Sequence, residues 1–191
     1  MNKSKLKKYI DQLATIEPTA WKDLSGKFEP VVYQKDEKIL SVGEVETCIY
    51  FLNRGLVRKF VPTGEEKSIS IGFFFENSFF SDYNSFLTES PSFYSIEALT
   101  EIEILKINRE NLFNLYEKYN SINTLGRIVT QNFFLEVLNY MTDSISLSGE
   151  ERYKKILAVN PEFIQQVPVK YLSSFLGLHP NSLSRIRSKV K

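Results

Sequence analysis

The sequence predicts an α+β protein in which a jelly-roll β-barrel is followed by a long apolar helix and a pair of short helices. The barrel is predicted from short runs rich in β-branched and aromatic residues between residues 31 and 107, separated by turn signals such as Asn53-Arg54-Gly55. The long helix is predicted from apolar residues that recur over most of its circumference from residue 121 onward. The short pair is predicted from two amphipathic segments on either side of a glycine turn near the C-terminus.

Helical patterns flank the barrel on both sides. One covers residues 5–24, and another extends from about residue 109 to residue 143 and includes the long helix. After it, Ser148 and Glu151 have the spacing of a capping box, which predicts a further helix to about Val159.

The C-terminal pair has the pattern of a helix-turn-helix. Its first helix is predicted over residues 168–176, and Gly177 suits the left-handed position that ends it. The second helix opens at Pro180, with His179 as its N-cap. Because the second helix of such a motif lies in the DNA major groove, we predict a DNA-binding surface. The residues predicted to form it are Lys170, His179, Asn181, Ser182, Ser184, Arg185, Arg187 and Lys189.

The charge distribution favours the same interpretation. The whole chain has 24 Lys+Arg and 23 Asp+Glu, so its net charge of +1 is uninformative about nucleic acid. Residues 163–191, in contrast, contain five basic residues, Lys191 among them, and no acidic residue. A basic, Ser- and Asn-rich end on a mildly acidic body is the electrostatic pattern expected of a phosphate-binding surface. The alternative is a solvated helical hairpin at a chain terminus.

The composition excludes several kinds of site. Cys48 is the only cysteine, which rules out an internal disulfide, and its apolar, strand-like surroundings indicate a buried structural thiol. His179, the only histidine, is far from the barrel in sequence, so a histidine-based metal site or catalytic triad lacks its ligands. No apolar run approaches the length of a membrane span. We therefore expect a cytoplasmic protein that is not an enzyme, has no cofactor or metal, and does not contact a membrane.

The apolar circumference of the long helix indicates burial on two sides. One side is expected to pack on the barrel and the other on a second copy of the chain, because helix-turn-helix proteins read two-fold symmetric sites as dimers. The alternative is a central helix within one large core. The residues predicted to form the homodimer interface are Ile122, Val129, Phe133, Val137 and Tyr140.

In this order of elements the chain resembles the CRP/FNR family of bacterial transcription regulators. The most specific segment, ERYKKILAVNPEFIQQVPVKYLSSFLGLHPNSLSRIRSK, is similar to the branch of the family common in Bacteroidetes. The resemblance implies a double-stranded β-helix (jelly-roll) barrel of the cyclic-nucleotide-binding type with flanking helices over residues 1–120. It further implies a dimerisation helix over 121–143 and a DNA-binding helix-turn-helix domain over 144–191. Double-stranded DNA, a second copy of the chain and an unidentified small-molecule effector are the implied partners, and RNA polymerase is a further candidate.

The effector pocket departs from the pattern of the cyclic-AMP-binding members. In those proteins a Glu holds the ribose and an Arg pairs with the cyclic phosphate; here Asp82 and Ser92 occupy the two positions. No Lys or Arg occurs from Ser68 to Leu105, and a buried anion without a cationic partner is costly. We therefore expect cyclic AMP not to bind, and either an uncharged ligand or no ligand at all. The residues of the implied pocket are Ser81, Asp82, Tyr83, Ser92, Tyr94 and Ser95.

The leading hypothesis is thus a homodimeric DNA-binding regulator with a divergent sensor barrel. A second hypothesis stays open, in which the chain is a ligand-binding regulatory module that acts on a protein partner instead of DNA. A barrel enzyme of the cupin type would need several histidines, and the chain has one.

Overall fold

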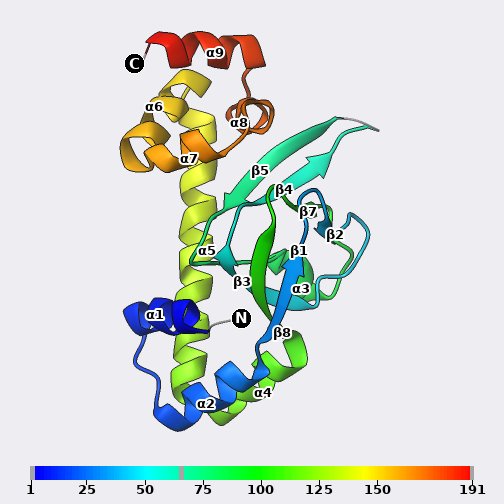
Figure 1. Cartoon of the computed structure of the whole chain (residues 1–191), viewed down its shortest axis with the longest axis vertical. Coiled ribbons are helices and arrows are strands. Elements are labelled where there is room, and N and C mark those ends of the chain that lie inside the picture. Colours follow the sequence, from blue (N-terminus) through cyan, green and yellow to red (C-terminus); the bar gives the residue numbers. More distant parts are fainter. Residues whose placement is uncertain (1–2, 65–66, 190–191) are drawn as a thin grey trace. The chain divides into compact units, whose positions relative to one another are not determined.

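The computed structural model describes residues 3–64 and 67–189 of the chain. They form two compact units, Met1–Lys59 with Phe73–Phe133 and Phe60–Gly72 with Phe134–Lys191. In chain order the elements are α1 (Ser4–Leu13), α2 (Pro18–Lys27), β1 (Glu29–Tyr33), β2 (Lys38–Leu40), β3 (Cys48–Arg54), β4 (Val57–Pro62), β5 (Ser68–Phe74), β6 (Ser78–Phe80), α3 (Tyr83–Thr88), β7 (Ser95–Ala98), β8 (Ile102–Asn108), α4 (Arg109–Lys118), α5 (Asn120–Ser146), α6 (Gly149–Val159), α7 (Pro161–Gln166), α8 (Val169–Leu176) and α9 (Pro180–Lys189) (Figure 1).

The strands form two four-stranded sheets, in the orders β1-β8-β3-β6 and β2-β7-β4-β5. The predicted jelly roll followed by helices is confirmed at this level. The first five residues of β3 are apolar, and the side chains on both of its faces are buried. Tyr50 and Leu52 belong to the core that includes Ile96 of β7, whereas Ile49 and Phe51 belong to a second core formed with the helices.

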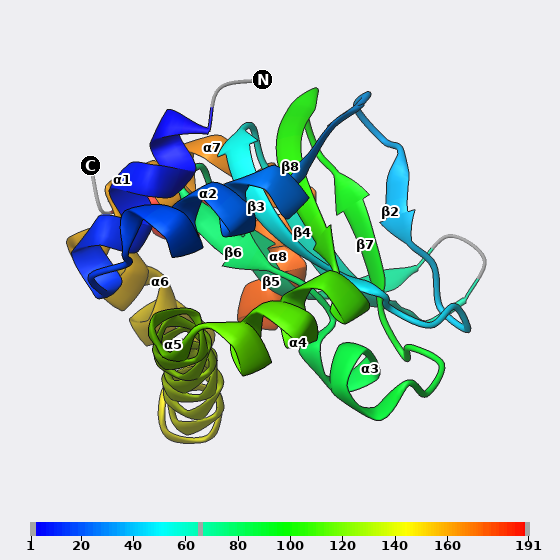
Figure 2. The same cartoon turned by 90° about the horizontal axis from the view of Figure 1, so that it is seen from below.

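This second core lies on the outer face of the sheet β1-β8-β3-β6. The helices α1, α2 and α4 and the first half of α5 contribute to it, and Figure 2 shows α1, α2 and α4 beside β3 and β8. The helical pattern over residues 5–24 corresponds to two helices. Pro18 is the first residue of α2, and Glu17 before it is extended, because the proline ring disfavours helical backbone in the preceding residue.

The second unit contains the second half of α5, the helices α6 to α9, the end of strand β4 and most of strand β5. The predicted capping box is present: the Ser148 hydroxyl accepts a hydrogen bond from the Glu151 N–H (3.3 Å), and the Glu151 carboxylate accepts one from the Ser148 N–H (2.8 Å). The Ser174 hydroxyl in α8 accepts from the Ser70 N–H (3.1 Å) and donates to the Ser68 carbonyl (3.2 Å), which ties α8 to strand β5.

None of the helices within the described ranges combines the length and the apolarity that a membrane crossing requires. Cys48 is a free, buried thiol as expected, and burial raises its pKa.

Candidate functional sites

The C-terminal helix pair has the local geometry that its sequence predicts. Helix α8 ends at Gly177, whose φ of 66° is the left-handed conformation that glycine adopts without strain. Helix α9 begins at Pro180, and the His179 Nδ1 accepts a hydrogen bond from the Asn181 N–H at 3.2 Å. His179 therefore acts as an N-cap, and this role fixes its side chain at the start of α9.

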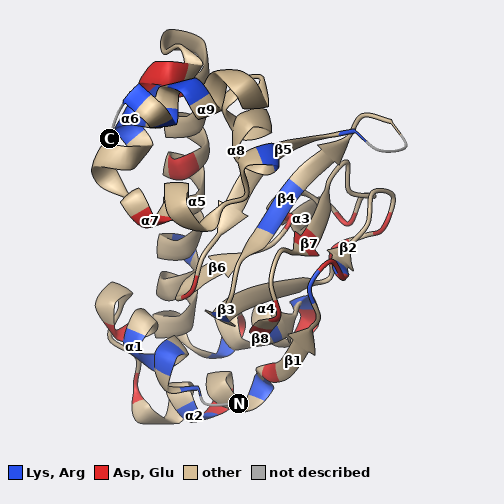
Figure 3. Ribbon diagram, turned by 45° about the horizontal axis from the view of Figure 1, so that its top comes forward, with Lys and Arg blue, Asp and Glu red and all other residues tan. Residues whose placement is uncertain are grey.

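One face of α9 is buried and the other is exposed. Leu183 and Ile186 pack inside the second unit. The opposite face exposes polar and basic side chains, and the sequence of α9 contains no Asp or Glu. The Lys and Arg residues of α9 are blue in Figure 3. The exposed face consists of Asn181, Ser184, Arg185, Ser188 and Lys189, and we call it the α9 polar face.

Two basic residues of the predicted DNA surface have different surroundings. Lys170 in α8 is exposed, and its ammonium lies 5.7 Å from the centre of the Tyr171 ring. Arg187 is half-buried and donates a hydrogen bond to the Ile164 carbonyl in α7 at 2.7 Å. Arg187 thus stabilises the packing of α9 on α7. Ser182 is half-buried, and Lys191 lies outside the described residues.

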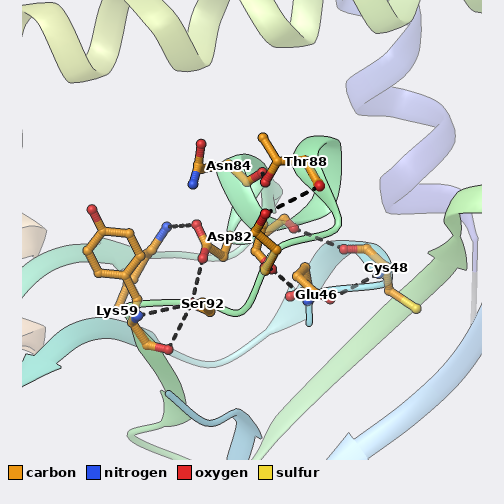
Figure 4. A network of polar contacts seen from close by, with 11 residues as sticks. Glu46, Cys48, Lys59, Asp82, Asn84, Thr88 and Ser92 are labelled. Atoms are coloured by element: carbon orange, nitrogen blue, oxygen red, sulfur yellow. Dashed lines mark hydrogen bonds and ion pairs between the residues drawn. The ribbon is translucent and has the colours of Figure 1, made fainter. Parts of the chain in front are cut away.

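In the barrel, three residues of the predicted effector pocket meet at one buried carboxylate (Figure 4). The Ser92 hydroxyl donates to Asp82 Oδ2 at 2.5 Å and accepts from the Tyr94 N–H at 2.9 Å. Lys59 Nζ lies 2.9 Å from Asp82 Oδ1 and 4.2 Å from the centre of the Tyr94 ring. Asp82 is only 1% exposed, so its charge is neutralised inside the barrel by the lysine. We call Lys59, Asp82, Ser92 and Tyr94 the Asp82 cluster.

Lys59 was missed by the sequence reasoning. The stretch from Ser68 to Leu105 contains no cation, whereas Lys59 comes from β4, which lies earlier in the chain. Lys59 follows Val57 by two positions and therefore shares its inward face, since side chains alternate along a strand. The β-strand period of VRKFV was the signal that could have placed it at the pocket.

The other three pocket residues have separate partners. The Ser81 hydroxyl donates to the Cys48 carbonyl at 2.9 Å, and the Ser95 hydroxyl accepts from the Val42 N–H at 3.1 Å. The Tyr83 and Thr130 hydroxyls are 2.7 Å apart, so Tyr83 connects α3 to α5. The structure therefore brings together Asp82, Ser92 and Tyr94 but directs the remaining predicted side chains elsewhere.

Glu46 is a second buried carboxyl near this region. Its Oε1 accepts hydrogen bonds from the Cys48 N–H and the Tyr50 hydroxyl, both at 2.9 Å. No described residue forms a hydrogen bond with Oε2. Burial raises the pKa of Glu46, and the nearby N–H groups, with the Tyr50 hydroxyl, offset only part of that rise.

The residues of the predicted dimer interface lie in different environments along α5. Ile122 is 1% exposed and belongs to the helix-side core of the barrel, so its side chain does not reach the surface. Val129 and Phe133 pack against the same core. Tyr140 stacks on Phe175 of α8 with ring centres 5.1 Å apart, and Val137 is 66% exposed. Of the predicted set, Val137 alone presents a largely exposed side chain.

The second half of α5 exposes other large apolar side chains. Helical spacing places them on one side of the helix, and we call them the α5 stripe: Phe134, Val137, Leu138, Met141 and Ile145.

Comparison with known proteins agrees with this architecture. Residues 30–119 match the cyclic nucleotide-binding domain family. No curated protein matches the sequence. Among solved structures, the chain is similar to FixK2 from Bradyrhizobium japonicum, with a TM-score of 0.72, 17% identity and coverage of 85% of this chain and 84% of that one.

Two further structures extend the comparison. CooA from Carboxydothermus hydrogenoformans, solved as a mutant, has a TM-score of 0.70 and 12% identity, with 87% of this chain and 77% of that chain covered. A regulator described as belonging to the CRP/FNR family, from Eubacterium rectale, has a TM-score of 0.67 and 15% identity, with 90% and 82% covered. Residues 30–119 are thus similar to cyclic nucleotide-binding domains, and the chain shares the fold of these solved regulator structures.

Proposed function

We propose that the chain is a homodimeric, DNA-binding transcription regulator of the CRP/FNR type, from the branch common in Bacteroidetes, whose effector domain has diverged from cyclic-AMP binding. In this proposal the sensor domain comprises residues 1–120, the dimerisation helix residues 121–143 and the DNA-binding domain residues 144–191. The protein acts in the cytoplasm, where DNA and RNA polymerase are available to it.

The observation that carries the proposal is the α9 polar face. Its side chains are exposed on a helix whose other face is anchored by Leu183 and Ile186, so the helix can enter a groove without losing its packing. Asn181 and Arg185 are suited to bidentate contacts with adenine and guanine, respectively. Lys170 and Lys189 are the proposed phosphate contacts, whereas Arg187 is bound to the α7 carbonyl.

Dimerisation is proposed through the α5 stripe. A run of exposed apolar side chains on one helical face is unfavourable in water and is typical of an interaction surface. A second copy of the chain is the natural occupant, because two antiparallel recognition helices read a symmetric site. The stripe lies C-terminal to most of the predicted interface residues and shares Val137 with them.

The Asp82 cluster supports the absence of cyclic-AMP binding. A cyclic phosphate needs a cationic or donor partner when it leaves water. Here the ammonium of Lys59 is already paired with Asp82, and the Ser92 hydroxyl donates to the same carboxylate. A nucleotide would have to break both contacts and leave the Asp82 charge close to its own phosphate.

Selection from a random duplex DNA pool tests the proposed function. We expect the full chain to enrich a two-fold symmetric site with half-sites about 10 base pairs apart, one helical turn. The matched control is the double variant Asn181→Ala with Arg185→Ala, which keeps the buried face of α9 and is expected to enrich no sequence. Failure of the folded wild-type dimer to enrich any sequence at low salt would favour a protein partner instead of DNA.

A further inference from the structure

A surface pocket of about 480 Å³ lies where three segments of the first unit meet. Its lining consists of Val45, Glu46 and Thr47 from the loop before β3, Glu89 from the end of α3, and Arg109, Glu110, Phe113 and Asn114 from α4. The volume is within the range of about 300–1,000 Å³ that is usual for small-molecule sites. No residue of the Asp82 cluster lines this pocket, so it is a separate site.

Hydrogen bonds hold the three segments together. The Arg109 N–H donates to the Thr47 carbonyl at 2.9 Å, which joins α4 to the loop before β3. The Glu46 N–H donates to the Ser85 hydroxyl at 2.9 Å, and the Glu89 N–H donates to the Ser85 carbonyl at the same distance. Because Ser85 is fully buried, the fold itself keeps the loop and the end of α3 in place around the pocket.

Helix α4 contributes a carboxylate, an aromatic ring and an amide to the lining. Glu110, Phe113 and Asn114 are three and four positions apart, so they lie on one helical face. Phe113 is 38% exposed and Val45 is 40% exposed, and together they give the pocket an apolar wall. No described residue forms a hydrogen bond or an ion pair with the Glu110 carboxylate. The pocket therefore combines apolar surface with an unpaired negative charge.

The cation of the lining is already occupied. Arg109 forms an ion pair with Glu89, and its guanidinium carbon lies 5.2 Å from the centre of the Phe113 ring. Glu46 Oε2, in the same lining, is a buried acceptor with which no described residue forms a hydrogen bond. Both this oxygen and the Glu110 carboxylate favour a ligand that donates hydrogen bonds and carries a positive charge.

We propose that this pocket binds a small organic cation in which an ammonium group is joined to one aromatic ring, an arylalkylamine. The ammonium pairs with Glu110, and the ring packs on Phe113 and Val45. The apolar wall favours an organic ion over a hydrated metal ion, and the unpaired carboxylate favours a cation over an anion. The proposal concerns binding to the sensor domain and does not depend on DNA binding.

An NMR titration of the full chain without DNA tests the proposal with three probes of similar size. Phenylethylamine carries the ammonium, phenylethanol is its uncharged counterpart, and phenylacetate carries a carboxylate. We expect the amine to bind wild type about fivefold more tightly than the alcohol, the ratio that a partly exposed ion pair provides. Phenylacetate should bind more weakly than the alcohol, because Glu110 repels it.

Substitution of Glu110 provides the second arm of the experiment. Glu110→Gln keeps the size of the side chain and removes its charge, so amine affinity should fall to the level of the alcohol while alcohol affinity stays unchanged. The matched control is Glu117→Gln, which removes an exposed charge of α4 outside the pocket lining and should preserve the fivefold ratio. Phe113→Ala should weaken the amine and the alcohol alike, because the ring of each packs on Phe113.

Three results would overturn the proposal: no probe binds folded wild type, the amine binds no more tightly than the alcohol or phenylacetate, or folded Glu110→Gln keeps the preference of wild type. If Glu110→Gln does not fold, the comparison of the three probes on wild type decides. A chain that fails to select DNA can still bind the amine, so the two proposals fail separately.

Discussion

The buried carboxyl of Glu46 makes the stability of the barrel sensitive to pH. Its Oε1 is held by the Cys48 N–H and the Tyr50 hydroxyl, but burial still raises its pKa. A folded-state pKa above the unfolded value means that the native state binds the proton more tightly. The free energy of unfolding therefore falls as the pH rises from about the usual value of 4.5 through the folded-state pKa.

Glu46→Gln should remove this pH dependence. The amide keeps an acceptor for the Cys48 N–H and the Tyr50 hydroxyl but carries no charge. We expect the urea midpoint of wild type to fall between pH 4.5 and neutral pH relative to that of the variant. Urea titrations at several pH values in this range measure the midpoint of unfolding. The control is Glu44→Gln, which changes an exposed carboxyl two residues earlier. Parallel pH profiles for wild type and Glu46→Gln would show that the carboxyl is not desolvated in the native state.

The Asp82 cluster predicts that cyclic AMP does not bind. The nucleotide would compete with an ion pair and a hydrogen bond that are already formed inside the barrel. Calorimetry on the full chain should show no saturable heat, and Ser92→Arg, which restores the family's cation, tests whether the missing charge is the reason. A micromolar dissociation constant for wild type, about −8 kcal/mol, would contradict the prediction.

At the scale of elements, the α5 stripe is predicted to hold the dimer together. Val129, although it is one of the predicted interface residues, is unsuitable for a charge substitution because it packs against the barrel core, where a carboxylate would disturb the fold. Val137→Glu with Met141→Glu changes exposed positions only. Burying two carboxylates from each protomer in an apolar interface costs several kcal/mol, so dimer affinity should fall at least about a hundredfold.

Weaker dimerisation lowers the average molecular mass in solution, which sedimentation equilibrium measures. Asn139→Glu adds a carboxylate to an exposed position of the same helix, about 140° around the axis from Phe134 by helical geometry, and should stay dimeric. If the double variant were folded and as dimeric as wild type, the α5 stripe would not be the interface.

Some elements and contacts could be predicted from the sequence, and others could not. The α8–α9 turn was predicted because its signals are local: Gly177 ends one helix and Pro180 begins the next. The pairing of Lys59 with Asp82 was not predicted from the sequence. It joins residues 23 positions apart, which the fold brings together where β4 lies beside the start of α3. The apolar circumference of α5 predicts burial on two sides, but periodicity does not distinguish a chain's own core from a partner. Ile122 lies in the chain's own core, and the burial of the exposed α5 stripe against a second copy stays a prediction.

At the scale of the whole molecule, a nearly neutral chain carries a locally basic C-terminal segment. The net charge of +1 gives no general attraction to DNA, so we expect the proposed association with DNA to depend on the few cations near α9. This arrangement predicts a small number of phosphate contacts and a moderate dependence on salt. It also predicts that base recognition and phosphate binding can be separated by substitution, because Arg185 and Lys189 occupy different positions on the exposed face of α9.

Binding of the selected duplex DNA by wild type, Arg185→Ala and Lys189→Ala, measured by fluorescence anisotropy over a range of salt concentrations, tests the central claim most directly. We predict that Arg185→Ala costs about 1–3 kcal/mol and relaxes preference at one base pair per half-site. Lys189→Ala should weaken all sequences alike and lower the slope of log affinity against log salt by about one. If folded, dimeric Arg185→Ala kept both the affinity and the base preference of wild type, α9 would not be the recognition helix and the account would be contradicted.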